Sequence, residues 1–201
     1  MTDLAEARIG TYRLLARLVL AEIDAQLLEA LRDMPIFGQA LAASGGVEAL
    51  PALRVEYTRA FLMNAHPYES VSLDESGLLN TPQSGSVSEH YRQRGFEPEA
   101  AQRVAASDHL GLELEFMAHL IEGEAAARKM DNPFVAGSLK ADQLHFLEQH
   151  LLRWGPIFGR ALAEVAESPF YRTLGEALET FLLGDYEALV ACHSERSEES
   201  G

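Results

Sequence analysis

Apolar residues recur at every third or fourth position along almost the whole chain, which is the pattern of amphipathic helices. Asp3 and Glu6, near the start, have the spacing of a helix-capping box. The first helical stripe then comprises Leu4, Ala7, Thr11, Leu14, Leu15 and Leu18. No segment shows the strict alternation that a half-buried β-strand needs. The pattern therefore predicts an all-α fold, a single-domain helical bundle.

Glycine, proline and capping residues divide this pattern into helices of ordinary length. After the first helix, we expect helices over residues 24–33, 86–94, 107–129 and 138–154. Three more are expected from Pro51 past Phe61, from Pro156 to about Glu167, and from Pro169 to Gly184. Ser107 is the expected N-cap of the longest helix, and Gly155 with Pro156 is expected to break the helix before them.

Residues 64–85 lack clear periodicity, and a connection of this length is much longer than the usual ~4–6 residues. Because the segment holds Tyr68, Val71, Leu73 and several other apolar side chains, we expect it to lie against the helices.

The polar end of the chain, with its repeated Ser-Glu, is expected to be disordered. The expected division is a helical domain over residues 1–190 and a disordered polar tail over 191–201.

The formal net charge of −15, from 31 acidic and 16 basic residues, restricts the partners that this chain can bind. A phosphate backbone or an anionic membrane would be repelled, whereas a basic peptide would be attracted. The acidic start is unlike a signal peptide, and the apolar run 14–21 is too short to cross a bilayer. We therefore expect a cytoplasmic protein with no nucleic-acid partner and no stable membrane insertion.

Residues 108–117, Asp-His-Leu-Gly-Leu-Glu-Leu-Glu-Phe-Met, carry the densest group of chemically active side chains. Asp108 would lie in the first helical turn, where the helix dipole favours a carboxylate. His109 and Glu113 are four residues apart and can touch. The same residues admit two interpretations, a charge and a side-chain pair that stabilise a helix, or a binding site.

Metal binding is the alternative function, through His/Glu pairs on the 107–129 and 138–154 helices. A di-iron bundle would need two Glu-x-x-His pairs, and the sequence contains none. Phosphate-binding glycine loops and nucleophile elbows are also absent from the sequence, and the single cysteine, Cys192, excludes a Cys-only zinc site. We expect no catalytic residues, no resident cofactor and no enzymatic turnover.

A set of motifs over roughly residues 5–185 resembles one family. Its parts are Glu56-Tyr57-x-x-x-Phe61, His66-Pro67-Tyr68-Glu69-Ser70-Val71, Tyr91-x-x-x-Gly95-Phe96, Asp108-His109-x-x-x-Glu113-Leu114-x-Phe116-Met117, His150-Leu151-x-x-Trp154 and Phe170-Tyr171. This combination is similar to the TorD/DmsD/NarJ family of molybdoenzyme-specific assembly chaperones, also called redox enzyme maturation proteins.

The resemblance implies a TorD-like helical chaperone that binds the twin-arginine leader and the apoprotein of a molybdopterin oxidoreductase. Such a chaperone holds its client until the molybdenum cofactor is inserted and so prevents premature export. The resemblance also leaves open binding of the molybdenum cofactor or a guanine nucleotide. A monomer and a domain-swapped dimer, with a hinge near 95–107 or 130–138, are both compatible with the sequence.

The resemblance places Asp108 and His109, with the loop residues Tyr68, Glu69 and Ser70, in the leader-binding surface. Two guanidinium groups followed by an apolar stretch require carboxylates beside a hydrophobic groove. We therefore add Glu113 as a carboxylate and Phe116 as part of the groove. The predicted leader-binding residues are Tyr68, Glu69, Ser70, Asp108, His109, Glu113 and Phe116.

Overall fold

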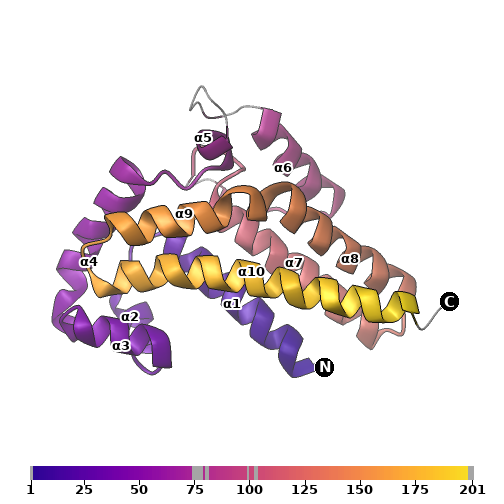
Figure 1. The fold of residues 1–201 in the computed structure, drawn as a ribbon, viewed down its shortest axis with the longest axis horizontal. Helices are drawn as coiled ribbons and strands as arrows, with labels where there is room; N and C mark the ends of the chain where they lie inside the picture. Colours follow the sequence, from indigo (N-terminus) through magenta and orange to yellow (C-terminus); the bar gives the residue numbers. More distant parts are fainter. Residues whose placement is uncertain (1, 74–78, 80–81, 99, 102–103, 199–201) are drawn as a thin grey trace.

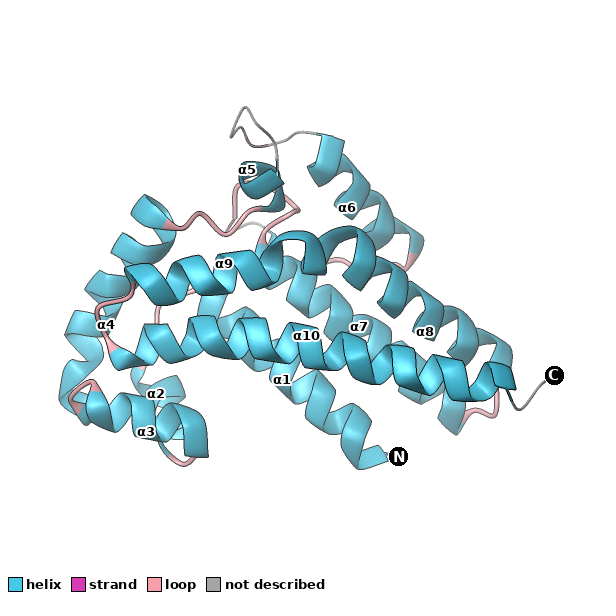
Figure 2. Cartoon of the chain, viewed as in Figure 1, coloured by secondary structure: helices cyan, strands magenta, loops and turns pink. Residues whose placement is uncertain are grey.

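The structure is a computed structural model that describes residues 2–73, 79, 82–98, 100–101 and 104–198, with the side chains of residues 2, 3, 83 and 192–198 left out. All named elements within these ranges are helical, so the predicted all-α fold is confirmed (Figure 2). The one β-type contact in the described part is an isolated bridge between Tyr68 and His109. Of the described helices, none is long and apolar enough to cross a membrane.

The helices follow one another with short connections, except between α5 and α6 and between α6 and α7. Their bounds are α1 (Thr2–Leu20), α2 (Ala25–Arg32), α3 (Pro35–Ala43), η1 (Gly46–Ala49), α4 (Leu50–Tyr57), η2 (Thr58–Asn64), α5 (Glu69–Leu73), α6 (Pro82–Gln93), α7 (Leu110–Lys129), α8 (Pro133–Phe146), η4 (Leu147–Leu151), α9 (Leu152–Val165) and α10 (Pro169–Glu198). Here η1 is a 3₁₀ turn, whereas η2 and η4 are wider π-helical turns.

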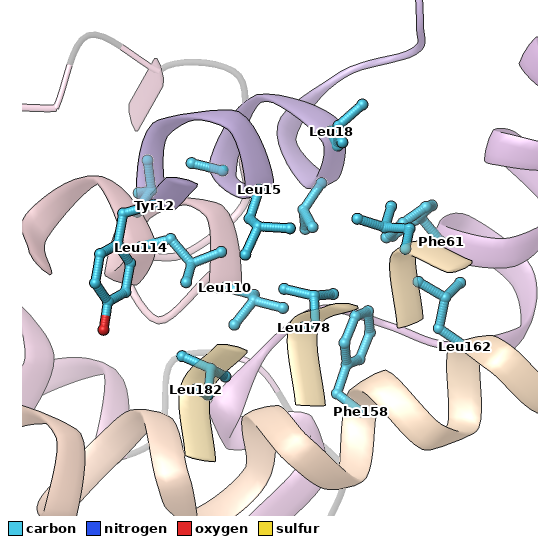
Figure 3. Packing of buried hydrophobic residues seen from close by; sticks show 14 of the residues in the cluster. Tyr12, Leu15, Leu18, Phe61, Leu110, Leu114, Phe158, Leu162, Leu178 and Leu182 are labelled. Carbon is cyan, nitrogen blue, oxygen red and sulfur yellow. The ribbon is translucent and has the colours of Figure 1, made fainter. Parts of the chain in front are cut away.

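Three helix pairs form the body of the fold: α1 packs along α7, α7 along α8, and α9 along α10 (Figure 1). The core lies between them (Figure 3), where Leu15, Leu114 and Leu182 meet from three helices and are each at most 2% exposed. Helix α7 is buried on almost every side, since twelve of its twenty residues are buried. This central position explains why α7 shows less periodicity than a surface helix.

Two glycines allow α9 and α10 to approach each other closely. A Cβ atom added at Gly159 would lie 2.6 Å from the carbonyl oxygen of Gly175, and one at Gly175 would collide with the Gly159 carbonyl in return. Backbone atoms cannot yield as a flexible side chain can. The spacing of this helix pair therefore depends on the absence of side chains at both positions.

Helix α10 continues past Gly184, where we expected it to end, and runs to Glu198. Asp185 gives the reason, because it accepts hydrogen bonds from Arg8 (Nε–Oδ1, 2.6 Å) and from the Tyr12 hydroxyl (2.8 Å) on α1. Leu189 is buried one turn later. These tertiary contacts outweigh the cost of about 1 kcal/mol for glycine inside a helix. Residues 199–201 of the predicted tail lie outside the described residues, so the boundary at residue 190 stays a prediction.

The predicted break at Gly155 and Pro156 is also wrong, because Pro156 lies inside α9. Helices α8, η4 and α9 follow one another without interruption from Pro133 to Val165. Proline lacks the N–H that would bond to the carbonyl four residues earlier, and helices with an internal proline kink or contain an irregular turn. The π-helical turn η4 lies immediately before α9 and supplies such an irregular turn.

Other boundaries differ at the starts of helices. Helix α3 was not expected, α6 begins at Pro82 rather than Ser86, and α8 begins at Pro133 rather than Ser138. All three have proline in the first turn, which is favourable because the first N–H groups of a helix have no partner inside it. We also expected α7 to begin after Ser107, but its N-cap is His109. We expected the long connection to lie against the helices. This is confirmed for residues 64–73, in which Ala65, Glu69 and Ser70 are buried.

Replacing Gly159 with alanine should destabilise the protein by about 1–3 kcal/mol, because the added methyl group overpacks the α9–α10 contact. Gly137→Ala is the matched control, since an added Cβ there meets nothing within 4 Å. It should stabilise α8 by up to about 1 kcal/mol through helix propensity alone. Chemical denaturation of both variants measures the difference, and equal effects would contradict the close contact.

Candidate binding site under helix α5

Backbone hydrogen bonds join segment 66–73 to the start of α7 and to the residue pair that precedes it. Glu69 N donates to the carbonyl of Asp108 (3.0 Å), and Leu110 N donates to the carbonyl of Pro67 (2.9 Å). Tyr68 stands edge-on to the His109 ring at 4.9 Å between centroids, and its hydroxyl accepts the N–H of Ala105 (3.1 Å). Two segments about forty residues apart in the sequence are thereby held side by side.

Asp108 stabilises α5 rather than α7, which differs from our expectation. It precedes the N-cap of α7, and its Oδ2 accepts the backbone N–H of Ser70 (2.7 Å). Capping of α7 falls to His109, whose Nδ1 accepts the N–H of Gly111 (3.1 Å). This bond also fixes the tautomer of a neutral His109 ring, with the proton on Nε2.

Three carboxylates gather beneath α5, and Glu69, Asp108 and Glu113 are each 0% exposed. We call them the acidic cluster. Glu69 Oε2 lies 2.8 Å from Nδ1 of His150, which is itself buried. His150 belongs to the π-helical turn η4, an irregularity of the kind frequent at functional sites. Residues from α5, α7 and η4 therefore meet in one buried polar site.

Glu113 is the most perturbed member of the acidic cluster. Burial raises the pKa of Glu113 well above its ordinary value, and the charges of Glu69 and Asp108 raise it further. The neighbouring Trp154 indole N–H opposes this shift by favouring the charged form, although it lies outside hydrogen-bonding geometry to the Glu113 oxygens. Desolvation and like charges therefore both disfavour ionisation of the Glu113 carboxyl in the folded chain.

Several polar atoms around the acidic cluster have no hydrogen-bond partner within the described part of the chain. They are Glu69 Oε1, Ser70 Oγ, Asp108 Oδ1, both carboxyl oxygens of Glu113, His150 Nε2 and Trp154 Nε1. Buried polar groups without partners are uncommon in folded proteins, and each costs free energy. Their concentration here gives the site unused capacity to accept hydrogen bonds from a donor-rich group.

Phe116 lies behind this site in an aromatic group rather than on the surface. Its ring is 4.9 Å from Tyr91, 5.4 Å from Phe96 and 4.8 Å from Phe146 between centroids, and it is 1% exposed. It supports the wall of the site and does not form an exposed groove. The other six predicted leader-binding residues are brought together around the α5–α7 contact, and among them Tyr68 alone is more than 9% exposed.

Two residues of this site, His150 and Trp154, were not among the predicted binding residues. They lie four residues apart at the junction of η4 and α9, so both reach the acidic cluster from one side. Their motif, His150-Leu151-x-x-Trp154, was visible in the sequence. Their contact with Glu69 and Glu113 was not, because it depends on how segments 40 and 80 residues apart fold together.

The His/Glu pairs considered as metal ligands are not joined by a third ligand within the described part of the chain. Among the described side chains, no three His, Cys, Asp or Glu residues form a group that could hold a metal ion. His119 instead lies with Nε2 3.1 Å from the carbonyl oxygen of Arg94, and Asp142 forms an ion pair with Arg94.

The pKa of His109 is lowered to about 4, chiefly by burial and against the opposing charge of Asp108. Between that pKa and the ordinary value of about 6.5, the unfolded chain binds a proton that the folded chain does not. This histidine therefore makes the free energy of unfolding fall as the pH is lowered through that window.

His109→Asn should remove this contribution and keep α7 capped, because asparagine is a good N-cap residue. The loss of stability between about pH 6.5 and pH 4 should be smaller than in the wild type, by up to about 1.4 kcal/mol per pH unit. His109→Ala should also lose the cap, at about 0.5–2 kcal/mol at every pH. Urea denaturation across this range measures both, and parallel pH profiles for wild type and His109→Asn would contradict the assignment.

Comparison with known proteins agrees with the sequence motifs. The sequence model of the nitrate reductase delta subunit family matches residues 19–160, more than half of the chain. Chaperone protein TorD of Aliivibrio fischeri is 31% identical over 152 residues, which cover 74% of this chain and 69% of that protein. The TorD protein of Aliivibrio salmonicida is 29% identical over 65% of this chain and 60% of its own length. That of Vibrio vulnificus YJ016 is 29% identical over 69% of this chain and 64% of its own length. The predicted resemblance is confirmed, and the chain belongs to the TorD/NarJ family, the nitrate reductase delta subunit family.

Proposed function

We propose that this chain is a cytoplasmic chaperone for the maturation of a molybdoenzyme. It binds the twin-arginine leader and the apo form of the catalytic subunit, assists cofactor insertion and prevents premature export. Family membership supports the chaperone role, because the relatives are named chaperones. The protein acts by binding, without catalytic turnover.

The acidic cluster is the observation that carries leader binding. Guanidinium groups are planar, permanently charged and present five N–H donors, so they match carboxylates that have unused acceptor atoms. Glu69, Asp108 and Glu113 together leave four such oxygens without partners in the described part of the chain. An arginine side chain placed beside Asp108 and Glu113 would satisfy three of these acceptors and compensate the negative charge.

The charge of the whole chain supports the same proposal. At −15, the protein attracts a basic peptide from a distance and raises its rate of encounter. Long-range attraction does not select arginine over lysine, whereas bidentate geometry at the carboxylates does. Selectivity for arginine would therefore come from the acidic cluster.

Calorimetric titration with synthetic twin-arginine leaders, each beside its Arg-Arg→Lys-Lys form, tests the proposed function. We expect micromolar binding to at least one leader, about −8 kcal/mol, and weaker binding of the lysine form by tenfold or more. Equal affinity for the two forms would remove the carboxylates from recognition. Failure of molybdoenzyme leaders to bind below about 100 µM would contradict the proposal itself.

Asp108→Asn should weaken leader binding by about tenfold or more, because the charge is removed from the acidic cluster. The remaining amide oxygen can still accept the N–H of Ser70, so the melting temperature should change little. Asp33→Asn, which makes the same change on an exposed residue that follows α2, is the matched control. Its effect on binding should be below about twofold, because solvent and salt screen an exposed charge.

The prediction of a monomer or a domain-swapped dimer can be examined with the same samples. Light scattering at each titration step separates leader binding from exchange of segments between two chains. Binding of the molybdenum cofactor or of a guanine nucleotide stays a prediction of the resemblance, and titration with GTP tests the latter.

A further inference from the structure

Burial of the acidic cluster raises a question of access. Glu69, Asp108 and Glu113 are each 0% exposed, so no guanidinium from outside can contact them in this conformation. The elements packed around them are α7, which carries Glu113, the η4–α9 junction, α6, whose buried Tyr91 lies near all three charges, and the segment 66–73. Of these, segment 66–73 carries only the five-residue helix α5.

Segment 66–73 has few attachments to the rest of the described chain. Helix α5 has five residues, and its main neighbours are α6 and α9. Three backbone N–H groups form its described hydrogen bonds to the body: those of Glu69 and Ser70 donate to Asp108, and that of Leu110 donates to Pro67. In addition, the Tyr68 hydroxyl accepts the N–H of Ala105, and Glu69 contacts His150. In Figure 1 this helix lies at the edge of the molecule, above α9.

Such a segment can open without unfolding the bundle. Isolated helices this short are not stable on their own in water, and elements with few buried apolar contacts open first. The Glu69 side chain leaves with the segment, because it belongs to α5, whereas Asp108, Glu113 and His150 stay with the body. Opening would expose two carboxylates and release His150 from its partner.

We propose that residues 66–73 form a latch over the acidic cluster, and that the latch must swing away before a guanidinium group reaches Asp108 and Glu113. This inference rests on the proposed function and adds that leader binding is coupled to a local opening. His150 is a positioning residue in this scheme, since its contact with Glu69 holds the latch closed.

The closed form of the latch carries an energetic cost, because it holds like charges together out of water. Desolvation and the charges of Glu69 and Asp108 disfavour ionised Glu113, and hydration on opening relieves both. The Glu69–His150 contact and the backbone bonds oppose this tendency. When a ligand binds only the open form, its apparent dissociation constant increases as the population of that form decreases. A variant that opens more often should therefore bind the ligand more tightly.

Native-state hydrogen exchange on the free, full-length chain tests the latch without any leader. The amides of Glu69, Ser70 and Leu110 should exchange through a local opening, at least tenfold faster than those of Met117 and Leu120 inside α7, and independently of low denaturant. Exchange of the three amides at the same rate as the α7 amides, with the same denaturant dependence, would overturn the latch.

His150→Gln should raise the exchange rate of these three amides by tenfold or more and leave those of Met117 and Leu120 unchanged. His145→Gln is the matched control, because His145 lies in the same run of helix, is exposed and has no described bond to Glu69. Equal rates in the two variants would remove His150 from the latch. If His150→Gln does not fold, Tyr68→Phe, which removes the hydroxyl that accepts the Ala105 N–H, should raise the same rates.

Leader titration of the same variants tests the coupling. His150→Gln should bind the leader at least threefold more tightly than His145→Gln, and the three latch amides should lose protection in the bound state. Unchanged affinity despite faster exchange, or added protection of the three amides, would overturn the coupling. Absence of leader binding in every variant would refute the proposed function and with it the coupling, while the exchange rates of the free chain still decide whether the latch opens.

Discussion

Burial of three carboxylates in one place is the constraint on which the organisation of this protein depends. Carboxylates lose much hydration energy inside a protein unless charges or hydrogen bonds replace it. Here Glu69 contacts His150, and Asp108 accepts the N–H of Ser70. Glu113 has no partner of good geometry in the described part of the chain, and its pKa is raised. The site is therefore suited to a cationic ligand, which a purely apolar core could not bind.

The helical body serves to hold this site. Helix α7 presents Glu113 from a central position, flanked by α1 and α8. The Gly159–Gly175 contact brings α10 close against α9, which carries Trp154. The links from Asp185 to Arg8 and Tyr12 then join the late part of α10 to α1. The short helix α5 thus lies at the edge of a body of long helices and is attached to it by few described bonds, an arrangement suited to a body that stays folded while its cover moves.

Much of this fold could be predicted from the sequence, because buried faces repeat at helical spacing. Leu53, Tyr57 and Phe61 point inward as expected, and the expected turn before α8 includes Asp131, whereas Asn132 is the N-cap and Pro133 the first residue of that helix. Pro156 and Gly184 misled the prediction since tertiary packing outweighs local preference in a long buried helix. Helix α3 was missed because most of its residues are apolar and its stripe is hard to distinguish.

The candidate site was predictable in composition and less so in arrangement. Motifs identified Glu69, Asp108 and Glu113, and the structure brings them together. Spacing alone could not show that Asp108 caps α5 from outside α7, nor that His150 contacts Glu69 across 81 residues. Phe116 was expected at the surface because an aromatic side chain suits a groove, and it proved to be the centre of an aromatic group. Contacts between distant segments carry that information, and periodicity does not contain it.

The protonation state of Glu113 is the most direct test of leader recognition by the acidic cluster. Carbon-13 NMR of the glutamate carboxyl groups, assigned with Glu113→Gln and followed against pH, reports it in the free and the leader-bound chain. We predict a pKa of Glu113 above its ordinary value in the free chain, since burial and neighbouring charges raise it. Binding of a twin-arginine leader should lower that pKa, and the lysine form should lower it less. An unchanged Glu113 titration in a fully leader-bound sample would contradict a guanidinium in the acidic cluster.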